Sequence, residues 1–257
     1  MLTLKNIHKT YNKGSINETV LFSGFNLTVA DGQFISVVGS NGSGKSSLLN
    51  IICGSIEIDS GSILLRDKEI TSLREHKRAE FIGRVFQDPS KGTCPHMTIL
   101  ENMSLADNKG KSYGLTMGVN KKRTDYYKTQ LEQLKLGLED KLNVEVGALS
   151  GGQRQALALL TSTMTPIDLL ILDEHTAALD PKTSENIMEL TDQIVKSKGI
   201  TTLMVTHNLK FAVEYGNRIL MMHNGAAVID AADAEKQEIG INNLLSVFNE
   251  ISIECGN

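Results

Sequence analysis

Apolar and polar residues alternate in two stretches near the start of the chain. A period of two places every second side chain on the same face of a strand. This pattern is typical of half-buried strands in an antiparallel sheet. We therefore predict an antiparallel sheet at the N-terminal end. The apolar positions are Leu2, Leu4, Phe25, Leu27 and Val29.

A denser apolar run at residues 34–38 predicts a buried strand. It leads into a glycine-rich stretch and then into residues 46–53, whose apolar spacing predicts a helix. Gly54 follows that stretch, and glycine commonly ends a helix. The pattern therefore indicates a strand, a loop and a helix in succession.

Two later apolar runs, at 169–172 and 201–205, also predict buried strands. The first ends in Asp173 and Glu174, and His207 follows the second. Ligands of an open parallel sheet bind beyond the carboxyl ends of its strands. We therefore expect all three runs to present chemically active residues at one edge of the sheet.

Helical spacing replaces the strand pattern between residues 88 and 165. We predict one domain over 1–257, with a core formed by 1–87 and 166–257 and a helical subdomain at 88–165. Intervals of three and four residues predict one helix through Tyr127, Leu131, Leu134 and Leu138. A second helix is expected to begin at Asp180 and Pro181 and to bury Ile187, Leu190 and Ile194. Residues 108–124 are expected to form a surface loop.

The composition is that of an ordinary globular protein. Its 257 residues include 26 Lys and Arg against 30 Asp and Glu, a net charge of −4, so no global basic footprint points to nucleic acid. The basic runs at 74–78 and 121–123 are expected to be solvated faces. No apolar stretch approaches the roughly 20 residues of a membrane-spanning helix, and the first residues lack the apolar segment of a secretory signal. We therefore expect a cytosolic chain.

A glycine-rich run between the predicted strand and helix matches the phosphate-binding loop. Its glycines allow a tight wrap in which backbone N–H groups face the phosphates, and the next helix adds its positive end. Lys45 is then expected to contact the terminal phosphates, and Ser46 to bind Mg²⁺. The loop alone leaves GTPases, kinases and helicases open. The run is Gly39, Ser40, Asn41, Gly42, Ser43, Gly44, Lys45 and Ser46.

A second motif narrows these classes, and it consists of Leu149, Ser150, Gly151, Gly152 and Gln153. It resembles the signature of ATP-binding cassette (ABC) ATPases, and other motifs similar to those of the family occur in the expected order along nearly the whole chain. The resemblance implies a P-loop NTPase of the α/β class. Its features are a mainly parallel sheet core, an N-terminal antiparallel subdomain and an inserted α-helical subdomain. The implied activity is ATP hydrolysis, with ATP and Mg²⁺ as cofactors.

The resemblance also assigns roles to residues outside the two motifs. Tyr11 is similar to the aromatic residue that stacks on adenine, and Gln87 to the glutamine that links Mg²⁺ to movement of the helical subdomain. Asp173 resembles the carboxylate that holds Mg²⁺, and Glu174 the one that polarises the attacking water. Further matched positions are Ser47 beside the phosphate loop, Asp180 in a dimer-contact loop, and His207 as the switch histidine.

His175 departs from the family pattern, because most members have proline at this position. A metal or proton-relay role is the alternative for a histidine at this position. No second ligand has matching spacing, so a neutral replacement is the simpler interpretation.

The resemblance implies three kinds of partner. Two cassettes meet head to tail, either as a homodimer or with a similar cassette, so that Ser150, Gly151 and Gln153 of one subunit contact the phosphate held by Lys45 of the other. An integral membrane permease is expected to bind at 95–103, although the apolar residues there also fit a plain helix core. An extracytoplasmic solute-binding protein completes the expected system, which places the chain on the cytoplasmic face of the membrane.

Several functions compete with import. We favour an importer of a small solute such as an amino acid, because the permease is not fused to the chain. A separate exporter ATPase and a cytosolic assembly ATPase of the iron-sulfur scaffold type are the alternatives. A repair, chromosome or translation-type cassette is disfavoured, because long coiled-coil insertions, zinc-spaced cysteines and a second phosphate loop are missing from the sequence. The sequence does not name the cargo.

Overall fold

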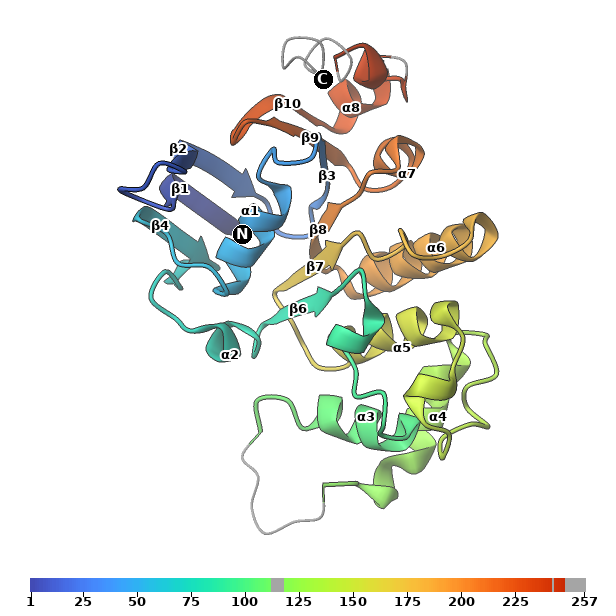
Figure 1. Ribbon diagram of the computed structural model, residues 1–257. Helices are drawn as coiled ribbons and strands as arrows, with labels where there is room; N and C mark the ends of the chain where they lie inside the picture. The colour runs from blue at the N-terminus through green and yellow to red at the C-terminus, as the bar shows by residue number, and fades with distance from the viewer. Residues whose placement is uncertain (112–117, 242, 248–257) are drawn as a thin grey trace.

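Two β-sheets enclose the first helix of the structure. The computed structural model describes residues 1–111, 118–241 and 243–247. Figure 1 shows α1 (Lys45–Cys53) between a four-stranded antiparallel sheet and one face of a six-stranded sheet. The strand order is β2-β1-β4-β5 in the first sheet and β10-β9-β3-β8-β7-β6 in the second. The strands are β1 (Leu2–Tyr11), β2 (Thr19–Val29), β3 (Phe34–Gly39), β4 (Ser60–Leu65), β5 (Lys68–Glu69), β6 (Ile82–Val85), β7 (Leu169–Asp173), β8 (Thr201–Val205), β9 (Arg218–His223) and β10 (Ala226–Ala232).

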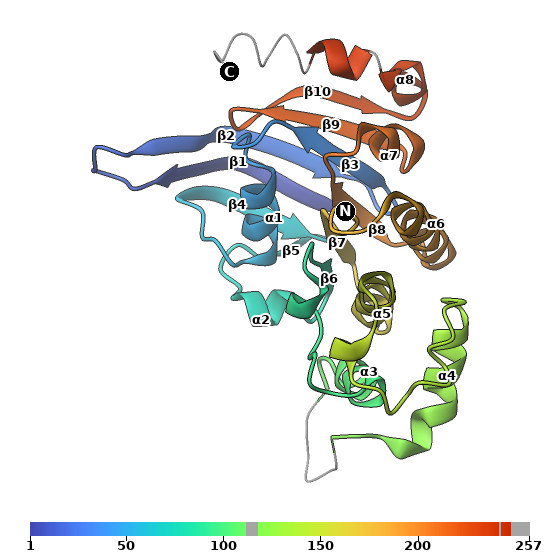
Figure 2. The ribbon, with the colours of Figure 1, turned by 45° about the vertical axis from the view of Figure 1, so that its right-hand side comes forward.

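The predicted strands are confirmed. β1 and β2 pair antiparallel, with Leu2 opposite Val29 and Leu4 opposite Leu27. In the larger sheet, β8 lies between β3 and β7 and is parallel to both, so the carboxyl ends of these three strands meet at one edge. Residues from both sheets and from α1 form one core, because the apolar face of each sheet must be covered. Figure 2 shows α6 (Pro181–Lys198) and α7 (Leu209–Glu214) on the opposite face of the larger sheet.

Buried Arg78 corrects the prediction that residues 74–78 form a solvated face. Its side chain is only 3% exposed. A buried guanidinium needs acceptors for its hydrogen bonds, and here carbonyls supply them, because α1 leaves its last C=O groups without partners inside the helix. Arg78 thus ties the end of α1 to the segment before α2 (Glu75–Arg78). The accepting carbonyls are those of Ile51, Ile52, Thr71 and Leu73, at 2.8–3.0 Å.

Helices dominate the chain between β6 and β7. They are α3 (Ile99–Asp107), α4 (Thr124–Glu132), α5 (Gly151–Thr163) and the short 3-10 turns η1 (Pro89–Lys91), η2 (Lys121–Arg123) and η3 (Val146–Ala148). They share a core of their own with Ile187 of α6. The boundaries of a separate subdomain at 88–165 stay a prediction. No helix of the described ranges has both the length and the apolar character needed to span a membrane.

The helix predicted through residue 138 is wrong in its length. α4 ends at Glu132, and the following turn contains Lys135 and Gly137 with φ of 55° and 64°. A right-handed helix cannot continue through left-handed residues. Leu134 and Leu138 are nevertheless buried, because the turn folds back onto the same core.

The loop predicted at 108–124 lies partly outside the described residues, which omit 112–117. The basic run at 121–123, which was predicted to be a solvated face, is less solvated than expected at one position. In η2, Lys121 and Lys122 are exposed, but Arg123 Nε lies 2.6 Å from the Asp107 carboxylate.

His175 follows β7 and is 2% exposed. Its Nε2 lies 3.2 Å from Thr191 Oγ1, while the Thr191 hydroxyl donates to the Ile187 carbonyl at 2.7 Å. The hydroxyl proton is therefore engaged, so Nε2 carries the hydrogen and donates to Thr191. Burial lowers the pKa of His175 to about 4, which keeps the ring neutral. No group of three or more His, Cys, Asp or Glu side chains that could hold a metal ion occurs within the described part of the chain. The replacement of the usual proline without a functional role stays a prediction.

The buried His175 ring predicts a loss of stability in mild acid. Because the folded-state pKa of about 4 lies below the ordinary 6.5, the unfolded chain binds the proton more readily, and the stabilisation is lost as pH falls from 6.5 towards 4. We expect this one site to lower the free energy of unfolding by about 3 kcal/mol across that window. Urea unfolding of wild type and His175→Gln at pH 7 and pH 4.5 measures it. An equal loss in both proteins would contradict the assignment.

Candidate functional site

The glycine-rich loop joins β3 to α1 where space is scarce. Gly39 has φ of 150°, and a Cβ added there would lie 2.2 Å from the carbonyl oxygen of Met222 on β9. Only glycine fits so close to a neighbouring backbone. Gly44 precedes α1 with φ of 104°, which turns the chain into the helix. The loop therefore wraps around the start of α1 as the sequence predicted.

Lys45 points back into this loop. Its Nζ donates to the carbonyls of Gly39 and Ser40 at 2.9 and 2.8 Å. Burial lowers the pKa of Lys45, and the charge of Glu174 partly opposes this shift. The only ammonium of the loop is thus held by neutral oxygens, which a phosphate group can replace as a stronger partner.

A cavity of about 170 Å³ opens over the loop. Lys45 and Ser46 line it, together with Glu174 after β7 and His207 after β8. The Tyr11 hydroxyl donates to Ser47 Oγ at 3.1 Å, so Tyr11 lies beside the same helix end. Backbone N–H groups, an ammonium and the start of α1 make this cavity suited to an anion. The remaining lining residues are Leu21, Asn41, Gly42, Gly44 and Ser47.

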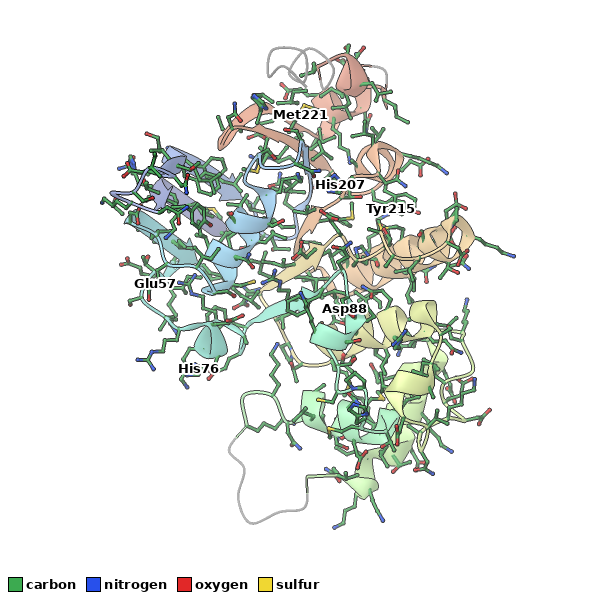
Figure 3. The ribbon with its side chains drawn as sticks, viewed as in Figure 1. Glu57, His76, Asp88, His207, Tyr215 and Met221 are labelled. Atoms are coloured by element: carbon green, nitrogen blue, oxygen red, sulfur yellow. The ribbon has the colours of Figure 1, made fainter. Side chains whose placement is uncertain are left out.

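Glu174 and His207 are bonded to each other. Oε1 of Glu174 lies 2.8 Å from Nε2 of His207, and the Glu174 side chain is 17% exposed. The backbone of Glu174 has φ of 49°, a left-handed conformation that is uncommon outside glycine and clusters at functional sites. His207, labelled in Figure 3, follows β8, the strand next to β7. The adjacency of the two strands therefore brings this pair together.

Asp173 has a partner that the sequence did not reveal. Nη2 of Arg84 donates to Asp173 Oδ2 at 2.7 Å, and both side chains are mostly buried. Arg84 lies on β6, which pairs parallel with β7, where Arg84 is opposite Ile171. An arginine inside a short apolar strand is the only sequence signal, and it does not identify a partner 89 positions away.

A larger cavity, of about 760 Å³, adjoins the carboxyl ends of β6 and β7. Ser46, Gln87 and Asp173 all line it, together with Glu174. Hydroxyl, amide and carboxylate oxygens are the donors that Mg²⁺ prefers, and Mg²⁺ is usually held by one or two protein groups together with substrate phosphates. The residues present therefore fit a magnesium ion bound with a nucleotide.

The signature motif forms the start of α5. Ser150 Oγ accepts from the Gln153 backbone N–H at 3.3 Å, and Gln153 Oε1 accepts from the Ser150 N–H at 3.2 Å, which is a capping box. Gly151 lines the larger cavity, whereas no signature residue lines the smaller one over the phosphate loop. Asp180 caps α6 by accepting from the Thr183 N–H at 3.1 Å, as predicted, and this bond lowers the pKa of its carboxyl.

The segment expected at the permease proves to be partly core. Ile99 and Met103 are fully buried in the helical core. Met97 and Leu100 are half-buried, and neither lines a cavity of about 370 Å³ that lies next to them. That cavity is instead bordered on α3 by Leu105, which is 47% exposed.

Comparison with known proteins gives relatives along nearly the full chain. It is 49% identical over 248 residues to the tyrosine transport ATP-binding protein of Clostridioides difficile strain R20291, a match that covers 96% of this chain and 98% of the relative. It is 32% identical over 243 residues to the methionine import ATP-binding protein MetN of C. difficile strain 630, covering 92% of this chain and 70% of the relative.

Solved structures agree in fold. A dimeric ATP-binding cassette bound to ADP and phosphate, in a post-hydrolysis state, is 31% identical with a TM-score of 0.76 over 90% of this chain and 98% of its own. A cassette of an ABC transporter in its ADP conformation is 26% identical with a TM-score of 0.80 over 100% of this chain and 99% of its own.

Residues 22–177 match the family model described as ABC transporter. This span includes the phosphate loop, the signature motif and both carboxylates after β7. The chain belongs to the ABC transporter family, as one of its ATP-binding and ATP-hydrolysing subunits.

Proposed function

We propose that this chain energises the uptake of a small solute, the amino acid tyrosine or a close analogue, by hydrolysing ATP. The observation that carries the proposal is the 49% identity to a protein named for tyrosine transport, over 98% of the length of that protein. The lower identity to a methionine import protein is consistent with the class of solute. Selectivity for the solute would belong to other subunits of the same system.

The phosphate loop and the residues after β7 divide the chemistry between them. Lys45 would leave the carbonyls of Gly39 and Ser40 and bind the terminal phosphates. Glu174 would accept a hydrogen bond from the attacking water and polarise it. Ser46, Gln87 and Asp173 would hold Mg²⁺, which supplies charge neutralisation at the phosphate oxygens when bound.

The remaining contacts concern adenine and the water. Tyr11, held beside α1 by Ser47, would stack on adenine. His207 would keep the carboxylate of Glu174 in place through the bond that it already makes. Positioning and charge therefore account for most of the proposed catalysis.

A second cassette would complete the site. At the start of α5, Ser150 is exposed and Gly151, Gly152 and Gln153 are half-buried. None of them borders the phosphate-loop cavity of its own chain. A head-to-tail homodimer would place this positive helix end on the terminal phosphate of the partner, with Asp180 in the contact loop. The related dimeric cassette supports this arrangement.

A membrane permease would bind at the cavity beside α3. This hollow is lined by the apolar Ile82, Phe86 and Leu105 and lies next to Gln87, so an inserted permease segment would contact the neighbourhood of the nucleotide site. Movement of 88–165 as a helical subdomain would transmit closure of the dimer. The chain would then lie peripherally on the cytoplasmic face of the membrane, with an extracytoplasmic solute-binding protein delivering the amino acid.

Replacement of Glu174 tests the hydrolytic site. Glu174→Gln keeps the shape of the side chain but loses the charge that polarises water, so we expect ATP binding to persist and turnover to fall by about a hundredfold or more. Turnover is measured as phosphate release, and dimer formation by size-exclusion chromatography with ATP. Ser150→Arg should instead bind ATP as a monomer and fail to dimerise. A mixture of the two variants should recover part of the activity, because Glu174 of the Ser150→Arg subunit and the intact signature of the Glu174→Gln subunit meet in one complete site. A mixture as inactive as either variant alone would contradict the shared site.

Leu105→Glu tests the permease surface. An unpaired charge resists burial against an apolar partner, so the variant should retain basal ATP hydrolysis and lose co-purification with the permease. Val228→Glu is the matched control, since Val228 is 45% exposed on β10, outside this cavity. Equal permease binding by both variants would show that the permease does not dock at the cavity bordered by Leu105.

Uptake of labelled tyrosine tests the solute. Cells that express the chain with its co-purifying permease should accumulate tyrosine, and Glu174→Gln should abolish the accumulation because transport then lacks its energy source. Unlabelled amino acids are added as competitors. ATP-dependent uptake that tyrosine does not inhibit would refute the assigned solute while leaving the ATPase intact.

A further inference from the structure

Arg84 and Asp173 form the most enclosed ion pair next to the proposed magnesium site. The exposed fractions of the two side chains are 13% and 18%, and the bond between Arg84 Nη2 and Asp173 Oδ2 is 2.7 Å long. Arg84 also lies over the ring of Phe86, with 4.5 Å between the guanidinium carbon and the ring centroid. The ring packs against the guanidinium face and keeps Nη2 directed at the carboxylate.

Among the described residues, no carboxylate other than that of Asp173 forms an ion pair with Arg84. Burial raises the pKa of the neighbouring Cys53 thiol to about 11, so this thiol is neutral at physiological pH. Glu75 borders the same cavity, but its Oε1 accepts a hydrogen bond from Ser55 at 2.7 Å. An arginine does not deprotonate in a protein. The permanent positive charge of Arg84 is therefore in contact with the Asp173 carboxylate, which would hold the metal.

We infer that Arg84 is an internal counter-cation, which occupies Asp173 in the nucleotide-free protein and keeps Mg²⁺ from binding there alone. A divalent ion at Asp173 would face the guanidinium at a few ångströms, and like charges at that distance repel strongly in a partly buried site. The phosphates of ATP add negative charge to the site. This negative charge offsets the repulsion between Arg84 and the metal ion, so Mg²⁺ and ATP bind together. This role rests on the proposed binding of Mg²⁺ by Asp173.

Two substitutions separate charge from shape. Arg84→Gln removes the charge but keeps an N–H donor for Asp173, whereas Arg84→Lys keeps the charge. The probe is Mn²⁺ alone, without nucleotide, because the EPR signal of the free ion disappears on binding. We expect Arg84→Gln to bind Mn²⁺ about tenfold or more tightly than wild type, and Arg84→Lys to remain close to wild type. Competition with Mg²⁺ shows that both ions use one site.

A double variant locates the site. Arg84→Gln with Asp173→Asn should lose the gained affinity, and thermal unfolding in the absence of metal checks that each variant is folded. Equal Mn²⁺ affinity in wild type and Arg84→Gln would overturn the inference, as would a gain that survives Asp173→Asn or appears equally in Arg84→Lys. None of these measurements depends on transport or on ATP turnover. The role of Arg84 can therefore be refuted while the proposed function holds, and the proposed function can be refuted while the role of Arg84 holds.

Discussion

Two carboxylates follow one another at the end of β7, and the cost of burying their charges is the constraint that the surrounding site has to satisfy. Each obtains its own partner from a neighbouring strand. Asp173 bonds to Arg84 of β6, and Glu174 bonds to His207 after β8. Unpaired charges in a mostly buried site would destabilise the fold. The parallel arrangement of β6, β7 and β8 is therefore what allows two adjacent acids to lie at the edge of this sheet.

Much of this architecture could be predicted because its signals are local. The strand at 34–38, the glycine loop and the helix ended by Gly54 follow from a few consecutive residues, and each is present. The cap of Asp180 on α6 is equally local. Local signals of this kind depend on backbone sterics and on hydrogen bonds between residues close in the sequence.

The unpredicted features depend on contacts between distant segments. Helical spacing continued past Glu132, but Lys135 and Gly137 adopt left-handed conformations while the apolar side chains stay in the core. Arg78 looked like part of a charged surface, although carbonyls at the end of α1 enclose it. The sequence around Arg84 did not indicate Asp173 as its partner, because the register between β6 and β7 decides which side chains meet. A sequence pattern thus located the phosphate loop, the two acids and His207, but not Arg84, the cation that pairs with Asp173.

The register of β6 has a consequence for how this chain can vary. Arg84 is aligned with Ile171, two residues before Asp173. Side chains alternate between the two faces of a strand, so a slip of one residue would turn Arg84 away and present Gly83 or Val85 instead. The link between α2 and β6 contains only residues 79–81. Connecting loops usually tolerate insertions and deletions, but a change of length here would uncouple an ion pair rather than merely reshape a surface.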